Sequence, residues 1–509
     1  MIATLSHYIH TPQRFVDNIG MYRVVTGSLA TLAGVSVLAG FIGWLPYSGQ
    51  SQLLALLLAL GVALLLNVVT AKVSRIPANH ESAIITALIL FFLVIPGESV
   101  IANWPLMAAV AIGIMSKFTI VYKKQHLLNP AAFGAAALSL SGLYVFSWWV
   151  GNPTLFIPLV ILGSLVVLKV RKWTPVLCFL GVGLLTFAFE AVRYGDSVET
   201  IARTYFLSWP VLFLAFYMLT EPFTMPPTKA TQAAYGVLVG FLVNTALFAP
   251  VLSMTPELAL LIGNLAVAPL RLRQKLYLKL LEKKEIAKNT FEFAFKKPAG
   301  FNFVAGQYIE WMLPHTPHDR KGTRRYFTIA SSPTESDVRA AMKIEDNPSS
   351  FKEALKSLDQ AGVVIGSQLA GDFVLPKDTK TKLGFIAGGI GVTPFRSHVQ
   401  YMLDSDKPFD TVLYYGNNSR AEIAYEALFQ KAASSFAFSL VNVISKELVS
   451  APYESGYVNR EIIKRRSSDY LERTWYVSGP PGMVAACARE LHSLGVPSKQ
   501  IKKDFFSGA

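Results

Sequence analysis

Apolar runs dominate the first 270 residues of this 509-residue chain and constrain its fold more than any other feature. About ten runs of roughly 15 to 22 residues occur there, a length that suits helices crossing a bilayer. This segment holds 13 Lys/Arg and 8 Asp/Glu, whereas the rest holds 34 and 25. We therefore expect a polytopic all-α membrane domain of about ten transmembrane helices, followed by ordinary globular domains. The runs begin near Val24, Gln52, Ala83, Ala102, Ala131, Leu155, Pro175, Tyr205, Ala233 and Leu258.

Basic residues fall on alternate connections between these runs. The other connections hold mainly acids, with Arg193 and Arg203 as their only basic residues. Cytoplasmic loops carry an excess of Lys and Arg, so this asymmetry predicts a multi-pass protein of the cell (inner) membrane with both termini cytoplasmic. The basic set is Arg14, Arg23, Lys72, Arg75, Lys117, Lys123, Lys124, Lys169, Arg171, Lys172 and Lys229.

Composition excludes several classes of function. Much of the net charge of +14 lies on one set of loops, and no basic stripe interleaves with aromatic residues, so no nucleic-acid partner is expected. The two cysteines, Cys178 and Cys487, are too few for an iron–sulfur cluster, and no metal site is predicted. The apolar runs contain no interior histidine, because His80 and His126 stand at their edges. Haem held by paired imidazoles is therefore not expected.

Patterning changes after about Lys275. Short alternating segments such as 290–295 indicate strands, and strand–helix units follow Lys382. We expect an antiparallel β-barrel domain and then a parallel α/β domain. The predicted division is 1–270 for the membrane domain, 271–376 for the barrel and 377–509 for the α/β domain.

Four motifs occur in order in the second half. They are FVAGQYIEW around Gly306, RYFTIASSP from Arg325, GGIGVTP from Gly388, and SGPPGM from Ser478. Glycines after a strand let the backbone approach a pyrophosphate at a helix N-terminus, although a lone glycine loop is weak evidence. The set in this order and spacing resembles the ferredoxin-NADP reductase family over essentially all of 275–509.

That resemblance implies an FAD site in the barrel. Arg325 would clamp the FAD pyrophosphate, Thr328 would contact flavin N5, and Phe327 would stack on the ring where the family usually has a tyrosine. The segment 347–358 predicts a capped helix, whose Ser349 and Ser350 either cap it, the favoured reading, or bind a phosphate. The full FAD set is Gln307, Tyr308, Arg325, Tyr326, Phe327, Thr328, Gly371 and Phe506.

The resemblance also implies an NAD(P) site. Ser478 stands where the family usually has a cysteine beside nicotinamide C4, so Ser478 and Thr328 are the candidate catalytic residues. Ser419 and Arg420 either bind the 2′-phosphate of NADPH or form an exposed loop, and NADPH is slightly favoured over NADH. His398 and His492 are expected to face solvent or cap helices. The remaining cofactor set is Gly388, Gly389, Gly391, Thr393, Pro394, Gly479, Pro480 and Met483.

Four segments of the membrane half resemble the RnfD/NqrB family, the membrane subunits of the Rnf complex and of sodium-translocating NADH:quinone reductase. They are SAIITALIL at 82–90, HLLNPAAFG at 126–134, FYMLTEPFTMPP at 216–227 and PELALLIGNLAVAPL at 256–270. The resemblance implies a flavin within the bilayer. Nearby prolines would break helices, so the polar residues beside them either bond an isoalloxazine edge or cap broken helices. These residues are Asn129, Thr220, Glu221 and Thr224.

Family members often carry a Ser-Gly-Ala-Thr run whose threonine bears FMN. Here the corresponding stretch reads YGDSVETIART, so the expected flavin, FMN or riboflavin, is noncovalent. Its phosphate is expected near Arg193 or Arg203.

These observations predict a membrane-bound NAD(P)H dehydrogenase. Electrons would pass from cytoplasmic NAD(P)H through FAD to the membrane flavin, and then to an extracytoplasmic flavoprotein or small molecule. The hydrocarbon core is about 30 Å thick, so an intermediate carrier is required. An NAD(P)H:quinone reductase, with or without ion translocation, is the alternative. A transporter that the reductase only gates is a third hypothesis.

Overall fold

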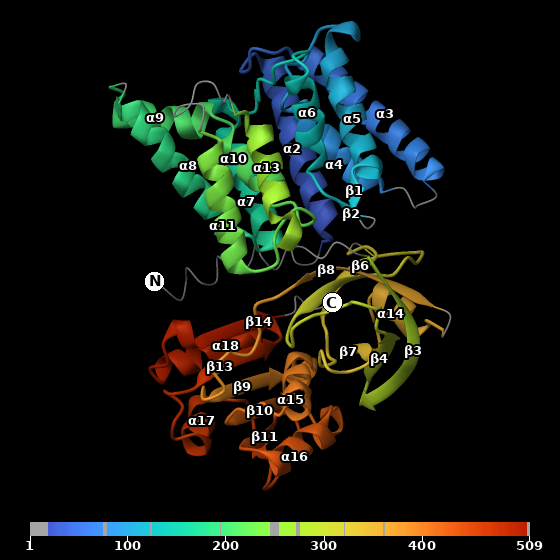
Figure 1. The fold of residues 1–509 in the computed structure, drawn as a ribbon, viewed down its shortest axis with the longest axis vertical. Helices are drawn as coiled ribbons and strands as arrows, with labels where there is room; N and C mark the ends of the chain where they lie inside the picture. Colours follow the sequence, from blue (N-terminus) through green and yellow to red (C-terminus); the bar gives the residue numbers. More distant parts are fainter. Residues whose placement is uncertain are drawn as a thin grey trace. The chain divides into compact units, whose positions relative to one another are not determined.

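The computed structural model describes residues 19–74, 79–122, 125–193, 195–244, 254–270, 275–319, 321–359 and 362–505. Two compact units make up the chain, Met1–Gln274 and Lys275–Ala509 (Figure 1).

Helices make up nearly all of the regular structure described in the first unit (Figure 1). A short hairpin of β1 (Val121–Tyr122) and β2 (Gln125–His126) interrupts them. The helices are α2 (Met21–Ile42), α3 (Gly49–Val73), α4 (His80–Phe91), α5 (Trp104–Thr119), α6 (Pro130–Leu140), α7 (Pro153–Val170), α8 (Trp173–Arg193), α9 (Val198–Arg203), α10 (Val211–Phe213), α11 (Lys229–Leu242) and α13 (Pro256–Val267). Two π-helical turns, η2 (Thr204–Ser208) and η3 (Leu214–Met218), continue α9 and α10.

The expectation of about ten spans is only partly met. Among the described residues, five helices are long and apolar enough to cross a membrane: α2, α3, α7, α8, and α5 extended to Ile101–Thr119. A sixth span is possible if Val198–Ser208 and Val211–Met218, which meet at a 52° bend, act as one. The structure thus supports five or six spans.

Helix α4 shows why hydropathy overcounted. Asn79 caps its N-terminus by accepting the backbone N–H of Ser82, and the helix ends after 12 residues, before Pro96 and Gly97. Helix α6, capped by Asn129, has 11 residues. At 1.5 Å per residue, each is shorter than 20 Å against a core of about 30 Å. Apolar residues therefore continue beyond the point where the helical backbone stops.

Small residues allow close helix packing in this unit. A side chain on Gly134 of α6 would meet the carbonyl oxygen of Ala109 in α5 at 2.2 Å, and one on Gly236 of α11 would meet that of Pro175 in α8 at 2.3 Å. Helix α3 buries one stripe of alanines at four-residue spacing, Ala55, Ala59 and Ala63. Such contacts suit helices that associate in an apolar medium.

The second unit begins with an antiparallel sheet. Its strand order is β6-β5-β8-β3-β4-β7, with α14 (Ser350–Lys356) between β7 and β8 in sequence. The core holds Phe293, Phe295, Ile309 and Trp311. The strands are β3 (Leu276–Ala287), β4 (Thr290–Lys296), β5 (Tyr308–Met312), β6 (Arg324–Thr328), β7 (Asp337–Lys343) and β8 (Val363–Ala370).

A parallel sheet follows, in the order β12-β11-β10-β9-β13-β14. The order reverses between β9 and β13, which places a crevice at the carboxyl ends of these two strands. These two sheets confirm the predicted order of an antiparallel domain and then a parallel α/β domain, whereas closure of the first sheet into a barrel stays a prediction. The strands are β9 (Leu383–Gly388), β10 (Thr411–Asn417), β11 (Phe438–Ile444), β12 (Glu454–Ser455), β13 (Thr474–Gly479) and β14 (Ile501–Phe505); the helices are α15 (Thr393–Ser405), α16 (Glu426–Ser435), α17 (Arg460–Arg466) and α18 (Pro481–Ser493).

Candidate functional site

Two glycine-containing loops meet at the point where the strand order of the parallel sheet reverses. The first follows β9 as a single 3-10 turn over Gly389–Val392 and leads into α15. The second follows the neighbouring strand β13 and leads into α18. A side chain on Gly391 would meet the Cα of Gly479 at 2.6 Å. The predicted residues of both loops therefore lie together at the carboxyl edge where nucleotides bind in such sheets.

Pro480, at the end of the second loop, and Met483, in the first turn of α18, close this junction. A Cβ on Gly388 would meet the sulfur of Met483 at 2.1 Å and Cδ of Pro480 at 3.2 Å. Pro394 occupies the first turn of α15, and the Thr393 hydroxyl donates to the carbonyl of Ile390 at 3.3 Å. Thr393 thus fastens the turn that precedes its helix.

Two predicted catalytic hydroxyls are buried without partners. Ser478, fully buried, is the last residue but one of β13 and lies beside Ala387 of β9, and Thr328 is 2% exposed at the end of β6. Neither hydroxyl has a hydrogen-bond partner. Unpaired buried polar groups are rare, and an absent ligand is one explanation for them.

Hydrogen bonds bring the end of β6 against α15. Arg396 donates to the carbonyl of Ala330 at 3.2 Å and forms an ion pair with Glu335, while the Ser397 hydroxyl donates to the carbonyl of Ser331 at 2.6 Å. Ala330 lies two residues after Thr328, and Arg396 lies three residues after Thr393. Thr328, the predicted flavin contact, and the glycine-containing loop that precedes α15 therefore belong to segments that are hydrogen-bonded to each other.

Arg325, the predicted pyrophosphate clamp, already holds an anion. Its Nη2 lies 3.1 Å from both carboxylate oxygens of Asp319, and one of those oxygens accepts the backbone N–H of Ser350 at 3.3 Å. Burial alone would raise the pKa of Asp319, but Arg325 and the Lys321 N–H outweigh it and leave that pKa below its ordinary value. Asp319 therefore stands where a phosphate would be bound by the same donors.

The aromatic residues of β6 face opposite ways, as a strand requires. Phe327 is buried against Phe351, with ring centroids 5.8 Å apart. Tyr326 is 41% exposed, stands edge-on to Tyr308 and donates its hydroxyl to Gln368. In this structure the exposed aromatic surface beside Thr328 is thus the Tyr308–Tyr326 pair, and the stacking role of Phe327 stays a prediction.

Loop residues flank this aromatic pair. Gly371 has φ +122° and lies against Gln307 and the Tyr308 ring. The Gln307 side chain accepts the backbone N–H of Val304 at 2.8 Å. At Ser349 no side-chain cap bond forms, although its hydroxyl is buried. Phe506 lies outside the described residues.

The expectation that His398 faces solvent is wrong. His398 is fully buried in α15, and its Nε2 lies 2.9 Å from the carbonyl oxygen of Phe373. It fits only because Gly306, at φ +89°, has no side chain; a Cβ there would lie 2.4 Å from Nε2. Burial lowers the pKa of His398 to about 4. His492, in contrast, is exposed, with Nδ1 3.2 Å from the carbonyl of Val496.

Ser419 and Arg420 lie in the turn after β10, separated from the strand by Asn418. Ser419 is half-buried and forms no capping bond, and Arg420 is bound to Glu447 after β11. The guanidinium of the candidate 2′-phosphate site is thus occupied by a carboxylate.

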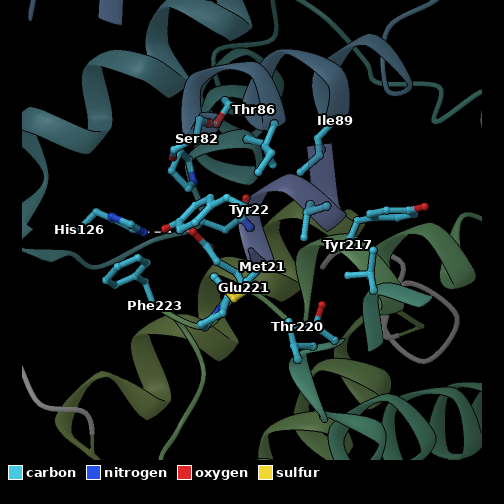
Figure 2. A pocket seen from close by; sticks show the side chains of 18 residues that line it. Met21, Tyr22, Ser82, Thr86, Ile89, His126, Tyr217, Thr220, Glu221 and Phe223 are labelled. Atoms are coloured by element: carbon cyan, nitrogen blue, oxygen red, sulfur yellow. Dashed lines mark hydrogen bonds and ion pairs between the residues drawn. The ribbon is translucent and has the colours of Figure 1, made fainter. Parts of the chain in front are cut away.

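In the first unit, one recess collects three of the four predicted flavin residues. Asn129, Thr220 and Glu221 line it, with about 650 Å³ of unfilled space including the open mouth (Figure 2). Thr224 is buried nearby and donates to the Glu221 carboxylate at 3.3 Å without lining the recess. The complete lining is Met21, Tyr22, Val25, Ser82, Ile85, Thr86, Ile89, His126, Asn129, Pro130, Ala131, Val166, Val170, Tyr217, Thr220, Glu221, Pro222 and Phe223.

Ionisable side chains lie in this recess or contact residues that line it. His126 Nε2 lies 3.0 Å from Glu221 and its ring packs on Phe223, as Figure 2 shows. Lys117 donates to the backbone carbonyl of Ser82 at 2.8 Å and to its hydroxyl at 3.0 Å. Sequence reasoning missed His126 and Lys117 because their partners are 95 and 35 residues away.

Arg193 and Arg203 do not line the recess. Arg193 instead pairs with the buried Glu190 at 3.1 Å. The expectation that one of them holds a phosphate of a flavin in this recess therefore finds no support in the geometry.

Comparison with known proteins identifies part of the chain. Residues 385–489 match the model of the oxidoreductase NAD-binding domain. The chain is 26% identical over 222 residues to the reductase component of propane 2-monooxygenase from Rhodococcus jostii (strain RHA1), covering 42% of this chain and 57% of that protein. It is 25% identical over 231 residues to the reductase subunit of stachydrine N-demethylase from Rhizobium meliloti (strain 1021), covering 43% and 64%.

Among solved structures, the cytochrome P450 reductase of Amycolatopsis is similar with a TM-score of 0.42 and 22% identity, over 46% of this chain and 70% of that one. The chain spans only 57% and 64% of the two relatives above. The matches show that the C-terminal half contains an oxidoreductase NAD-binding domain and is similar to reductase components, in agreement with the expected resemblance of this half to the ferredoxin-NADP reductase family. The RnfD/NqrB resemblance stays a prediction.

Proposed function

We propose that this protein is a membrane-bound NAD(P)H dehydrogenase of two flavins. FAD in the second unit would take electrons from cytoplasmic NAD(P)H, and a noncovalent FMN or riboflavin in the first unit would relay them to an extracytoplasmic flavoprotein or small molecule. The recess lined by Asn129, Thr220 and Glu221 is the single observation that carries the proposal.

Three features of the second unit fit FAD. Arg325 and the backbone N–H of Ser350 converge on the Asp319 carboxylate, which stands in for a phosphate. The hydroxyls of Thr328 and Ser478 are buried without partners. Bound FAD supplies a ring that accepts two electrons at once and releases them singly. In our proposal, Thr328 orients the flavin ring at N5. Ser478, a small and fully buried side chain, leaves room for the nicotinamide and keeps water away from it.

The recess in the first unit has the chemical character of a ligand pocket. Such pockets are mostly apolar with a few polar groups, and so is the lining of this recess. The first turns of α2, α4 and α6 all line it. Helix N-termini favour negative charge, so this environment favours a ring that gains electrons.

A bilayer arrangement accounts for the need for this second carrier. Five helices of the first unit could cross a membrane, and the bent pair Val198–Ser208 and Val211–Met218 makes six if it acts as one span. Six spans agree with the basic connections, which predict that both termini are cytoplasmic. A hydrocarbon core of about 30 Å is too thick for one electron step. Under our proposal the bilayer is therefore the permanent partner of the first unit, and the acceptor lies on its far side.

Quinone reduction is the second candidate. The His126–Glu221 pair at 3.0 Å is half-buried beside apolar Phe223 and could pass protons to a quinone that is reduced in the recess. In that case electrons would end within the membrane, with or without ion translocation.

Proteoliposomes separate these functions. Purified full-length protein would be reconstituted with an impermeant oxidised dye inside, and NADH or NADPH would be added outside. We expect the enclosed dye to be reduced without added quinone, at a rate that follows external nicotinamide oxidation. External ferricyanide reduction serves as the control for a working reductase unit. If ferricyanide is reduced and the enclosed dye is reduced only through added quinone, transmembrane transfer is rejected in favour of quinone reduction.

A further inference from the structure

The turn after β10 and the turn after β11 are fastened together at the carboxyl edge of the parallel sheet. The backbone N–H of Ser445 donates to the carbonyl of Asn417 at 3.0 Å, and that of Lys446 donates to the carbonyl of Asn418 at 2.9 Å. In sheets of this class, the residues after the second strand contact the adenosine ribose of the dinucleotide. An acid there bonds the ribose 2′-hydroxyl, whereas an arginine accommodates a 2′-phosphate.

Both kinds of residue are present and bound to each other. The Glu447 carboxylate accepts Nε of Arg420 at 2.8 Å through one oxygen and the Arg420 backbone N–H at 2.9 Å through the other. These two bonds hold the pKa of Glu447 below its ordinary value, and the bond from the backbone N–H has the larger effect. The carboxylate is therefore ionised at neutral pH. A side chain fixed by both oxygens is also less free to swing away than one that forms a single surface ion pair.

Other charges around this turn do not remove the repulsion that Glu447 would exert on a 2′-phosphate at Arg420. Lys446 adds one positive charge beside Glu447, and Glu422, three residues after Ser419, is paired with Lys343 at 2.9 Å. A 2′-phosphate brought to Arg420 would have to displace Glu447 or stand beside it. Two anions sharing one guanidinium repel each other, and such repulsion discriminates between ligands.

We infer that the Glu447–Arg420 pair makes this protein select NADH over NADPH, with Glu447 excluding the 2′-phosphate. The inference reverses the slight preference for NADPH that Ser419 and Arg420 alone suggest. It rests on the proposed oxidation of a nicotinamide by the second unit, and it makes Glu447 a specificity-determining residue.

The test compares kcat/KM for NADH and NADPH, with ferricyanide as acceptor, in the FAD-loaded full-length protein. Wild type should favour NADH by roughly tenfold or more, the size expected for one unfavourable charge contact. Glu447→Gln frees Arg420 and should raise kcat/KM for NADPH at least fivefold. Adding Arg420→Ala to that variant should remove the gain, since the gain depends on the freed guanidinium. Glu461→Gln, an exposed glutamate paired with Arg460 in α17, is the matched control and should leave the ratio unchanged.

Different results point to different failures. If neither coenzyme reduces the flavin in wild type, the proposed function itself fails. If wild type prefers NADPH, or if Glu447→Gln leaves the ratio within twofold of wild type while the protein stays active with NADH, the inference about Glu447 is overturned.

Discussion

At the scale of single residues, one carboxylate occupies a site expected to hold phosphate. Asp319 binds Arg325 through both oxygens and receives the backbone N–H of Ser350. Arg325 itself is 7% exposed and further bonded to the carbonyls of Lys321 and Gly322. Phosphate and carboxylate prefer the same forked donor, so FAD and Asp319 must compete for it.

Asp319→Asn should therefore tighten FAD binding. The amide removes the competing negative charge, and we expect the Kd of FAD to fall by roughly fivefold to tenfold, about one kcal/mol. Fluorescence titration of the FAD-depleted full-length protein measures this. Asp378→Asn, an exposed aspartate that bonds only its own turn at the Lys380 N–H, is the control. A Kd that rises in Asp319→Asn would mean that the carboxylate positions Arg325 for FAD instead of competing with it.

A single buried histidine predicts acid sensitivity of the second unit. The pKa of His398 is about 4 in the folded protein against an ordinary 6.5, chiefly because burial disfavours its charged form. As pH falls, the histidine of the unfolded chain therefore takes up a proton before the buried one does. The contribution of neutral His398 to the free energy of unfolding is complete above pH 6.5 and is lost as pH drops toward 4. The loss attributable to His398 is about 2 kcal/mol between pH 7 and pH 5.

His398→Gln keeps a donor for the Phe373 carbonyl but cannot titrate. The midpoint of heat-induced FAD release should therefore fall less between pH 7 and pH 5 in this variant than in wild type. His492→Gln, which changes an exposed histidine, should keep the wild-type dependence. If the midpoint of FAD release changed equally with pH in all three proteins, His398 would not be the cause of the acid sensitivity.

At the scale of elements, the two glycine-containing loops hold the candidate NAD site. Gly391 allows the turn after β9 to touch the backbone of Gly479, and any side chain would force them apart. Gly482, in the first turn of α18 directly after the second loop, has open space around its Cβ position. The two glycines therefore offer a matched comparison.

Gly391→Ala should raise KM for the nicotinamide by at least tenfold, because displaced loops lose contacts to the pyrophosphate. Gly482→Ala should stay within about threefold of wild type, as an exposed helix glycine does when replaced by alanine. Steady-state assays with ferricyanide distinguish the two. If both changes had equal effects on KM, the close contact between Gly391 and Gly479 would not be what binding of the nicotinamide requires.

Sequence predicted the elements whose signals are local. Strand β4 lies at Thr290–Lys296 where alternation indicates it, and the glycine-containing turns follow β9 and β13 because a strand, glycines and a helix are consecutive there. Short helices α4 and α6 were mistaken for full spans, since hydropathy counts apolar residues without registering where Asn79 and Asn129 start a helix or where it ends. His398 and the His126–Glu221 pair were missed because only tertiary contacts define their surroundings.

At the scale of the whole molecule, the chain combines a C-terminal unit that resembles NAD-binding oxidoreductases with an apolar helical unit that holds a recess. The two lie on one chain, divided between Gln274 and Lys275. A soluble reductase needs no such helical unit, and in our proposal the flavin in the recess gives that unit a part in electron transfer. Filling the recess should therefore stop transfer through the membrane unit without stopping NADH oxidation with ferricyanide.

Counting flavins in a recess-filled variant tests this central claim most directly. Val25 of α2 lines the recess, whereas Leu38 of the same helix is 63% exposed. Acid extraction and chromatography of purified full-length protein should give two flavins per chain, one of them FAD, in wild type and Leu38→Trp. Val25→Trp should retain FAD and lose the second flavin. A yield of FAD alone, one per chain in all three proteins, would contradict the account.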